Sequence, residues 1–407
     1  AASLTLSSMM RSQASAAEGL SGTPEKSVIW LWLPGGPTQV ETFDPKMTAP
    51  SEYRSVTGEV KTVLPGVTLG GNFEKMGQVA DRMAFVRSFA HTNSGHGGGT
   101  HFVMTGYDNR RIDNGGLQSR PSIGSIASKV RGPNNSSTGI PTYVRLSSIG
   151  ADGPAFLGPA YAPFDPNGQA RKNMNLETKV ERFDDRRELL GSLDKFRRDT
   201  DSHGLMNGLD AFEQQAFHML LGNSSDAFSI EKEKESTRQL YGKDQLAQQM
   251  LVARRLVEAG CGFVTVNYGG WDMHGTIEQS MKRRVPALDH AIASFITDVA
   301  SRGMSEDVLL VISGEFGRTP RINRNAGRDH WAPLSTLALA GGSFRMGQVV
   351  GESMSKADVP KSNPIRPQDL MATIFHHLGL DPKTQFVNQA GRAVFVLDEG
   401  QTIGELI

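Results

Sequence analysis

The sequence predicts an α/β protein, a three-layer sandwich in which helices cover both faces of a mostly parallel central sheet. Short runs rich in β-branched and aromatic residues alternate with longer helical stretches, which is typical of a parallel sheet with helical crossovers. Several of these runs are apolar at nearly every position, as expected of strands covered on both faces. The expected strands are residues 27–33, 83–89, 141–147, 262–268, 307–313 and 335–341.

The expected helices lie between these strands, at residues 72–82, 244–260, 283–303 and 366–380. A polar, helix-prone segment at 176–241 interrupts the strands and predicts a helical insertion or cap within an α/β domain that spans residues 27–400. Residues 1–26 are rich in Ala, Ser and Gly. They predict either the remnant of an export signal or a disordered leader.

Composition excludes several classes of function. The chain has 43 basic and 43 acidic residues and a net charge of zero, so we expect neither a nucleic-acid partner nor a basic membrane-binding face. No apolar run approaches the roughly 18 residues needed for a membrane-spanning helix. The single cysteine, Cys261, stands at the entry to an apolar strand and is expected to be a small buried residue.

Polar and glycine-rich loops follow the expected strands. In open parallel sheets, ligand-binding groups gather in the loops at the carboxyl ends of the strands. We therefore expect four such loops to meet at one edge and to form the functional site. They are PGGPTQVETFDP with Glu41 and Asp44, AHTNSGHGGGTH with His91, Ser94, His96, Thr100 and His101, GGWDMHG with Asp272 and His274, and GEFGRTPRINRNAGRDHW with Glu315, Arg318, Thr319, Asp329 and His330.

Imidazole and carboxylate groups dominate these loops, and they are the natural ligands of Zn²⁺ and related metals. A divalent ion bound there would activate water or stabilise charge on a phosphoryl or sulfuryl group. Zn²⁺ suits the mixed ligands best, with Mn²⁺, Fe and Ca²⁺ as alternatives. The candidate metal ligands are Asp272, His274, His330, Glu315, Asp329, His91 and His101.

Some of these groups have a second interpretation. Asp329 is either a ligand, a helix cap, or a partner that orients a ligand from outside. Arg318 either pairs with a carboxylate or clamps an anionic substrate. The glycines at 97–99 form either a tight turn or an opening through which backbone N–H groups reach an anion. Histidines in helical patterns are expected in the core or on the surface, namely His218, His290, His376 and His377, whereas His203 stays undecided.

The ordered series of motifs resembles a known family. VIWLWLPGGPTQVETFDPK, SGHGGGTHFVMTG, FLGPAYAPF, GGWDMHG, SGEFGRTPRIN and GRDHW, in this order between residues 27 and 385, resemble an exported bacterial family catalogued as domain of unknown function 1501. That family looks like a branch of the alkaline-phosphatase and sulfatase superfamily. The resemblance implies an alkaline-phosphatase-like fold and, because members commonly carry a twin-arginine export signal, a periplasmic or cell-surface location.

The resemblance also implies roles for particular residues. Asp272, His274 and His330 match the ligands of one superfamily metal site. At the second site, Glu315 matches one ligand in kind, and Phe316 stands where a histidine is usual. The aspartate that normally ends the first strand falls near Pro34 or Gly35, which leaves Glu41 or Asp44 as substitutes.

The resemblance to the superfamily does not identify the nucleophile. The superfamily places a Ser, Thr or modified Cys at the start of the helix after the second strand, where this chain has His96 with Ser94 and Thr100 nearby. The motif that sulfatases need to form formylglycine is absent from this sequence. The attacking group would be a metal-bound water, His96 or one of these hydroxyls.

Together these observations predict an exported, metal-dependent hydrolase of phosphate or sulfate esters, in which Arg318 neutralises substrate charge. The expected partner is a small anionic ester or a sulfated or phosphorylated glycan. The alternative is a non-catalytic protein on the same fold that binds such a polysaccharide. The catalytic candidates are His96, Thr100, Ser94 and Arg318.

Overall fold

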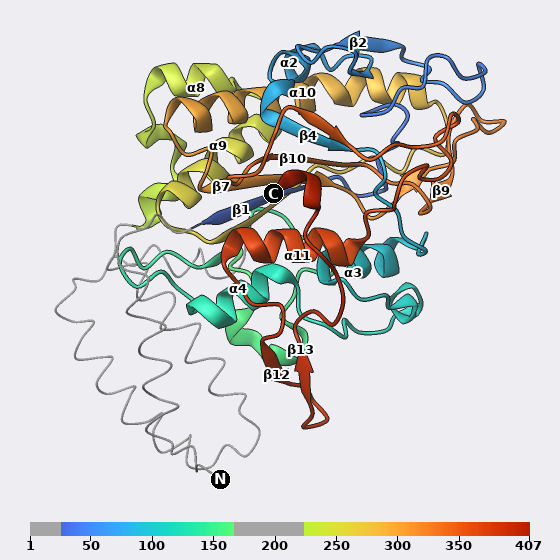
Figure 1. The fold of residues 1–407 in the computed structure, drawn as a ribbon. Coiled ribbons are helices and arrows are strands. Elements are labelled where there is room, and N and C mark those ends of the chain that lie inside the picture. Colours follow the sequence, from blue (N-terminus) through green and yellow to red (C-terminus); the bar gives the residue numbers. More distant parts are fainter. Residues whose placement is uncertain (1–25, 167–223) are drawn as a thin grey trace, which may run out of the picture.

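The computed structural model describes residues 26–166 and 224–407 and confirms the predicted α/β class. A seven-stranded sheet runs through the centre in the order β11-β4-β10-β7-β1-β6-β5 (Figure 1). All six expected strands are present in it, and the structure adds β11 at one edge. The strands are β1 (Ser27–Trp32), β4 (Met83–Val86), β5 (Tyr143–Arg145), β6 (Phe263–Asn267), β7 (Val308–Ser313), β10 (Leu337–Gly341) and β11 (Gln348–Val350).

One strand of the sheet runs against the others. β10 pairs antiparallel with β4 and with β7, while the other printed pairs in the sheet are parallel. Leu337, the first residue of β10, lies opposite Ser313 and Val86, the last residues of β7 and β4. The loop that enters β10 therefore reaches the same edge of the sheet as the loops that leave the parallel strands.

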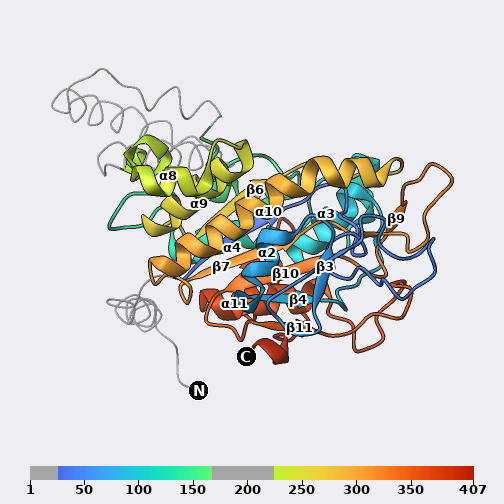
Figure 2. The same ribbon diagram turned by 90° about the horizontal axis from the view of Figure 1, so that it is seen from above.

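Helices cover both faces of the sheet, with one layer above it and one below it in Figure 1, and Figure 2 looks down on the upper layer. Along β1, Ile29 and Leu31 belong to one buried cluster, and Trp30 and Trp32 belong to the other, because successive side chains of a strand point to opposite faces. The first cluster includes residues of α2 (Glu74–Gln78), α9 (Gln245–Glu258) and α10 (Ile277–Ser301), and the second includes residues of α3 (His96–Thr105), α4 (Ile123–Arg131) and α11 (Pro367–Leu378).

The expected helix boundaries need some corrections. α10 begins at Ile277, before the expected start at 283, and continues through Pro286. α3 begins at His96, which is the first helical residue after the N-cap Gly95, and it is absent from the expected helices. Helix α4 was not predicted. Three short hairpins were also missed: β2 (Glu59–Lys61) with β3 (Thr68–Gly70), β8 (Gly317–Arg318) with β9 (His330–Trp331), and β12 (Gln385–Val387) with β13 (Ala393–Phe395).

Two predictions about organisation remain predictions. The leader at 1–26 lies almost entirely outside the described residues, and so do His203, His218 and most of the insertion at 176–241. The described end of that segment is helical, with η5 (Ser224–Phe228), η6 (Ile230–Lys232) and α8 (Glu235–Tyr241). None of the described helices is long and apolar enough to cross a membrane.

Single residues outside the loops behave as predicted. Cys261 is fully buried, and burial raises the pKa of its thiol to about 12. His377 is buried, His376 is exposed, and His290 is partly exposed.

Candidate metal centre

Four side chains come together at the edge of the sheet where the parallel strands end. His96 is the first residue of α3, in the loop region that follows β4. Asp272 and His274 lie between β6 and the start of α10, and His330 begins β9. The β8–β9 hairpin pairs Arg318 with His330, and Glu315 lies just after β7. The expectation that these loops meet at one edge therefore holds for these residues.

The carboxylate of Asp272 is the common neighbour of three imidazole Nε2 atoms. Its Oδ1 lies 3.0 Å from His274 Nε2 and 3.1 Å from His330 Nε2. Its Oδ2 lies 3.4 Å from His96 Nε2, and the Nε2 atoms of His274 and His330 are 3.1 Å apart. Donor atoms of His96, Asp272 and His330 all lie within 4.8 Å of one another.

The opposite nitrogen of each ring, Nδ1, faces an acceptor of the protein. His96 Nδ1 lies 2.7 Å from Glu315 Oε1, and His274 Nδ1 lies 2.6 Å from Asp329 Oδ1. His330 Nδ1 lies 2.9 Å from the carbonyl oxygen of Ser94. Because ionised carboxylates and carbonyls only accept hydrogen bonds, the neutral rings carry hydrogen on Nδ1 and present the lone pair of Nε2.

These contacts fit a divalent metal ion. Metal-binding histidines typically donate their second ring N–H to a carboxylate or a carbonyl, which fixes the tautomer and the ring orientation. Bond lengths of about 2.0–2.1 Å in a tetrahedral zinc site separate neighbouring ligand atoms by about 3.3 Å. The separations of 3.0–3.4 Å around Asp272 are close to that value. Three imidazoles and one carboxylate are also a donor set that suits Zn²⁺.

Nearby charges control the ionisation of the cluster. Partial burial opposes ionisation of Asp272, but the hydrogen bond and the positive charge of Arg318 oppose burial and hold the pKa at about 2. Burial lowers the pKa of His330, which favours the neutral ring that a metal needs. The hydrogen bond to Glu315 raises the pKa of His96, because it stabilises the protonated ring.

Arg318 pairs with a carboxylate, which is the first of the two roles that the sequence left open. Its side chain is fully buried, and its Nε and Nη1 donate to the carbonyls of Gly36 at 2.9 Å and Arg328 at 3.1 Å. Its Nη2 donates to the carbonyl of Gly35 and to Asp272 Oδ1, the latter at 2.5 Å. With these donors engaged and the side chain buried, the guanidinium positions Asp272 instead of clamping a substrate.

Backbone occupies the position where the resemblance implied a ligand after the first strand. Gly35 and Gly36 have φ angles of 105° and 77°, which non-glycine residues rarely adopt. A Cβ on Gly35 would lie 2.3 Å from the backbone nitrogen of Asp272. The loop after β1 therefore packs directly against Asp272, and its close approach leaves no space for a side chain.

Glu41 and Asp44 do not substitute for that ligand. Glu41 is fully buried and lies 3.1 Å from the guanidinium of Arg328 and 2.7 Å from the hydroxyl of Ser55. Asp44 is buried between Lys46 at 3.2 Å and Arg87 at 3.5 Å. Both carboxylates neutralise basic side chains elsewhere in the loops.

Glu315 orients His96. Its Oε1 accepts the backbone N–H of Gly35 at 2.8 Å and contacts His96 Nδ1, so this oxygen faces an imidazole N–H. The next residue, Phe316, packs its ring 4.4 Å from the ring of His330 and 5.2 Å from that of His96. Asp329 has a comparable orienting role beside His274, one of the alternatives that the sequence left open.

His91 and His101 do not join the cluster. The buried His91 ring lies 5.5 Å from the ring of Phe102, and burial lowers its pKa to about 4. His101 is fully buried, with Nδ1 2.7 Å from the Tyr107 carbonyl and Nε2 3.3 Å from the backbone nitrogen of Ser119. Both nitrogens of His101 are thus engaged by the protein, which corrects the prediction that it binds a metal.

The two candidate hydroxyl nucleophiles are also engaged. Thr100 is buried, and its Oγ1 donates to the carbonyl of His96 at 2.7 Å within α3. Ser94 Oγ accepts the backbone N–H of Ala332 at 3.1 Å. Of the groups proposed near the start of α3, His96 is the one that reaches the cluster.

The carboxylate of Asp113 occupies the N-terminus of α3, where the sequence allowed for the binding of an anion. Oδ1 of Asp113 accepts the backbone N–H groups of Gly97 at 2.9 Å and Gly98 at 3.0 Å. A Cβ on Gly98 would lie 2.5 Å from Asn93 and 2.7 Å from Asp113, so this glycine permits close approach of the covering loop. Sequence reasoning missed Asp113, because no motif marks it.

Comparison with known proteins assigns the family. A family model described as "Protein of unknown function (DUF1501)" matches residues 25–407. The chain belongs to this family. No curated protein matches the sequence of this DUF1501 protein significantly.

Several solved structures share a distant likeness with this DUF1501 chain. A sulfatase from Pseudoalteromonas sp. is 11% identical with a TM-score of 0.39, and the match covers 91% of this chain and 70% of that one. A phosphonate monoester hydrolase from Silicibacter pomeroyi is 10% identical with a TM-score of 0.37, over 88% and 74% of the two chains. A likeness this distant carries no conclusion about activity, so function must be argued from the site.

Proposed function

We propose that this DUF1501 protein is an exported, metal-dependent hydrolase of phosphate or sulfate esters. His96, Asp272, His274 and His330 would hold one divalent ion, with Zn²⁺ favoured by the three imidazoles. The observation that carries the proposal is that three Nε2 atoms surround the Asp272 carboxylate while the three Nδ1 atoms face Glu315, Asp329 and the Ser94 carbonyl. Such contacts fix the tautomer of each ring and leave its Nε2 lone pair available to a metal.

A bound divalent ion would supply a Lewis acid for an ester oxygen and would lower the pKa of water. The protein's own contribution is to hold the donor atoms in place. Glu315 and Asp329 keep the rings of His96 and His274 in one tautomer, and Arg318 keeps Asp272 ionised and fixed. The buried Thr100 donates its hydroxyl hydrogen within α3, whereas the exposed Ser94 only accepts a hydrogen bond. Water is the proposed attacking group, and Ser94 is the candidate hydroxyl that stays available.

The rival function is non-catalytic binding of a sulfated or phosphorylated polysaccharide. Two observations favour it. The Thr100 hydroxyl is buried and bonded within α3, and the residues at the expected second metal site, Glu315 and Phe316, instead contact His96 and His330. The polar side chains that converge on Asp272 favour the enzyme.

The test is metal content, measured by elemental analysis on protein purified without chelator and again after incubation with Zn²⁺, Mn²⁺ or Ca²⁺. The parent should carry one ion per chain, and Asp272→Asn and His330→Ala should each lose it while keeping the circular dichroism spectrum. Asp398→Asn, which changes an exposed carboxylate beside Arg120, is the matched control and should retain the ion.

The same metal-loaded samples are then assayed with 4-nitrophenyl phosphate and 4-nitrophenyl sulfate. Turnover that disappears with the ion supports the hydrolase. Equal metal content in the parent and in both variants would overturn the assignment of the centre. A tightly bound ion without turnover of either ester would favour the binding protein.

A further inference from the structure

A short loop next to the candidate centre is held tightly against it. Residues 319–329 connect β8 to β9, and Asn323 holds this loop in place. Its Nδ2 donates to the carbonyl of His274 at 3.1 Å and to Asp329 Oδ1 at 3.2 Å, while its Oδ1 accepts the backbone N–H groups of Asn325 and Gly327. The loop is thus bonded to the segment that carries the proposed metal ligands.

The same loop is joined to the start of α10. The backbone N–H groups of Thr276 and Ile277 donate to the carbonyls of Asn325 and Ala326 at 3.0 Å and 2.9 Å. Thr276 and Ala326 both have positive φ angles, 45° and 54°. Residues other than glycine persist in this region only where the surroundings hold them there. Side chains on this loop therefore stand on a fixed backbone.

Two arginines lie on this loop, and a third lies on the neighbouring segment. Arg321 and Arg324 are exposed on the loop. The backbone N–H of Ile322 donates to the Glu52 carbonyl at 2.9 Å, which brings the exposed Arg54 alongside. Arg328 also binds the carbonyl of Arg54 at 3.1 Å. We call Arg54, Arg321 and Arg324 the arginine strip.

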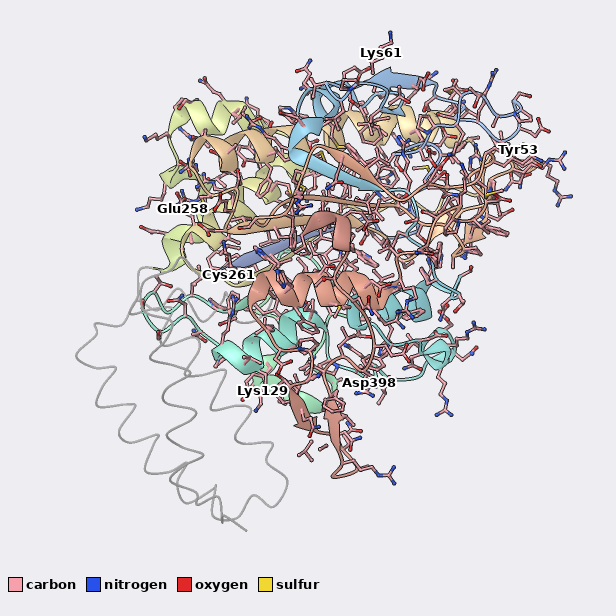
Figure 3. The ribbon with its side chains drawn as sticks, in the orientation of Figure 1. Tyr53, Lys61, Lys129, Glu258, Cys261 and Asp398 are labelled. Carbon is pink, nitrogen blue, oxygen red and sulfur yellow. The ribbon has the colours of Figure 1, made fainter. Side chains whose placement is uncertain are left out.

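The strip carries a net positive charge. Within residues 26–166 and 224–407, no ion pair is formed by any of its three guanidinium groups, and the exposed carboxylate of Glu52 beside them forms none either. Two other nearby carboxylates are engaged elsewhere. Asp329 bonds His274, and Glu41 bonds Arg328. A further cation, Lys356, lies 4.7 Å from the ring centre of Tyr53. Figure 3 shows Tyr53 at the same end of the molecule as β9 in Figure 1.

The candidate centre beside the strip is open to solvent. The side chains of His96, Asp272 and His274 are 47%, 46% and 47% exposed. Within the part of the chain that the structure describes, the proposed ligands therefore lie on an accessible surface. A site of this kind can receive one group of a long chain while the remainder of that chain extends across the neighbouring loops.

We propose that the arginine strip binds a polyanionic polysaccharide, so that the substrate is a chain bearing several sulfate or phosphate esters, one of which reaches the centre. Guanidinium groups bind such oxyanions through paired, charge-assisted hydrogen bonds. The inference that the bound polysaccharide is also the substrate rests on the proposed function, but binding of a polysaccharide by the strip does not. The inference adds to the proposed function the class of substrate and the residues that select it.

The observations favour a polysaccharide over a nucleic acid. Single-stranded nucleic acids are bound by aromatic rings that stack on bases along a basic groove. The aromatic residue next to Arg54, Tyr53, has Lys356 over its ring, and the chain as a whole has a net charge of zero. A strip of three guanidinium groups suits ester groups that are spaced along a neutral backbone.

The test measures binding of fluorescein-labelled dextran sulfate to the full chain, with uncharged dextran and a single-stranded oligonucleotide as comparison probes. The parent should bind dextran sulfate but not dextran. The double variant R321Q/R324Q should weaken this binding at least tenfold and reduce the slope of log affinity against log salt by about 2, since two ionic contacts are lost. R54Q should weaken binding in the same direction.

The matched control is Arg392→Gln. Arg392 is exposed in the β12–β13 hairpin, which projects from another side of the molecule at the bottom of Figure 1, and its replacement should leave dextran sulfate binding unchanged. Equal affinities in R321Q/R324Q and the parent would overturn the proposal, and so would oligonucleotide binding as tight as that of dextran sulfate. Metal content and ester turnover are measured separately. Dextran sulfate binding that depends on the strip, without ester turnover, would reject the hydrolase and keep the binding role of the strip. Ester turnover without strip-dependent binding would keep the hydrolase and reject the strip.

Discussion

Replacing Arg318 by methionine tests whether this residue is a structural support or a substrate clamp. Methionine fills a similar volume without charge or donors, so the substitution removes all hydrogen bonds of the guanidinium. Three of the acceptors are backbone carbonyls of buried residues, Gly35, Gly36 and Arg328, and the fourth is Asp272 Oδ1.

The expected loss of stability follows from those acceptors. A buried carbonyl that loses its donor costs about 1–3 kcal/mol, and three such carbonyls at the low end of this range amount to about 3 kcal/mol. Asp272 is 46% exposed, so water can replace the guanidinium there and we assign no further cost to that contact. Arg318→Met should therefore lower the free energy of unfolding by about 3 kcal/mol.

Urea denaturation of the metal-free protein, followed by circular dichroism, measures this change. Arg110→Met is the control, because Arg110 pairs with Asp108 at 3.3 Å on the surface and its side chain is 68% exposed. Its loss should cost less than about 1 kcal/mol. If Arg318→Met destabilises no more than the control, the support role is refuted. Unchanged stability with a raised KM would instead restore the substrate clamp.

Two further predictions concern the ring of His274 and a buried histidine. Asp329→Ala removes the acceptor 2.6 Å from His274 Nδ1 and should weaken metal affinity about 10–100-fold. Competition with a chelator measures this affinity. An unchanged affinity would show that Asp329 does not orient the ring. Burial lowers the pKa of His377 from 6.5 to about 4, so the unfolded chain takes up a proton first as the pH falls from 6.5 to 4. The free energy of unfolding should therefore decrease between pH 6.5 and 4 by up to about 3 kcal/mol because of His377. In urea melts, His377→Asn should flatten that part of the pH profile. Parallel pH profiles for the parent and the variant would contradict the assignment.

The strands and the approximate site were predictable because they depend on short-range patterns. Continuous apolar runs such as β7 and β1 mark strands covered on both faces, and the residues that follow parallel strands meet at one edge. The reversed β10 was not marked by its own pattern, because the direction of a strand leaves no trace in its residue alternation. Its orientation still brought His330 to the expected edge, since the loop before an antiparallel strand lies where the parallel strands end.

The roles of individual residues were less predictable. His96, His101 and His91 come from one loop and have the same chemistry, yet only His96 points its Nε2 toward Asp272. The difference arises because His96 begins α3, while His101 lies a turn further along and is held by Tyr107 and Ser119. The Asp113 carboxylate accepts backbone N–H groups at the start of α3, and the Ser94 carbonyl faces His330 Nδ1. No sequence motif marks either contact.

The sequence alone determined the α/β class, the family and the edge of the sheet where imidazole and carboxylate side chains gather, because periodicity and residue type are local properties. The tertiary structure decided which ring nitrogen of each histidine faces a hydrogen-bond acceptor, which acidic side chains form ion pairs with arginines, and that Arg318 supports Asp272. Those outcomes depend on partners up to 287 residues apart in the chain, such as Glu41 and Arg328. Distances of that kind are set only when the sheet has assembled and its loops have packed against one another.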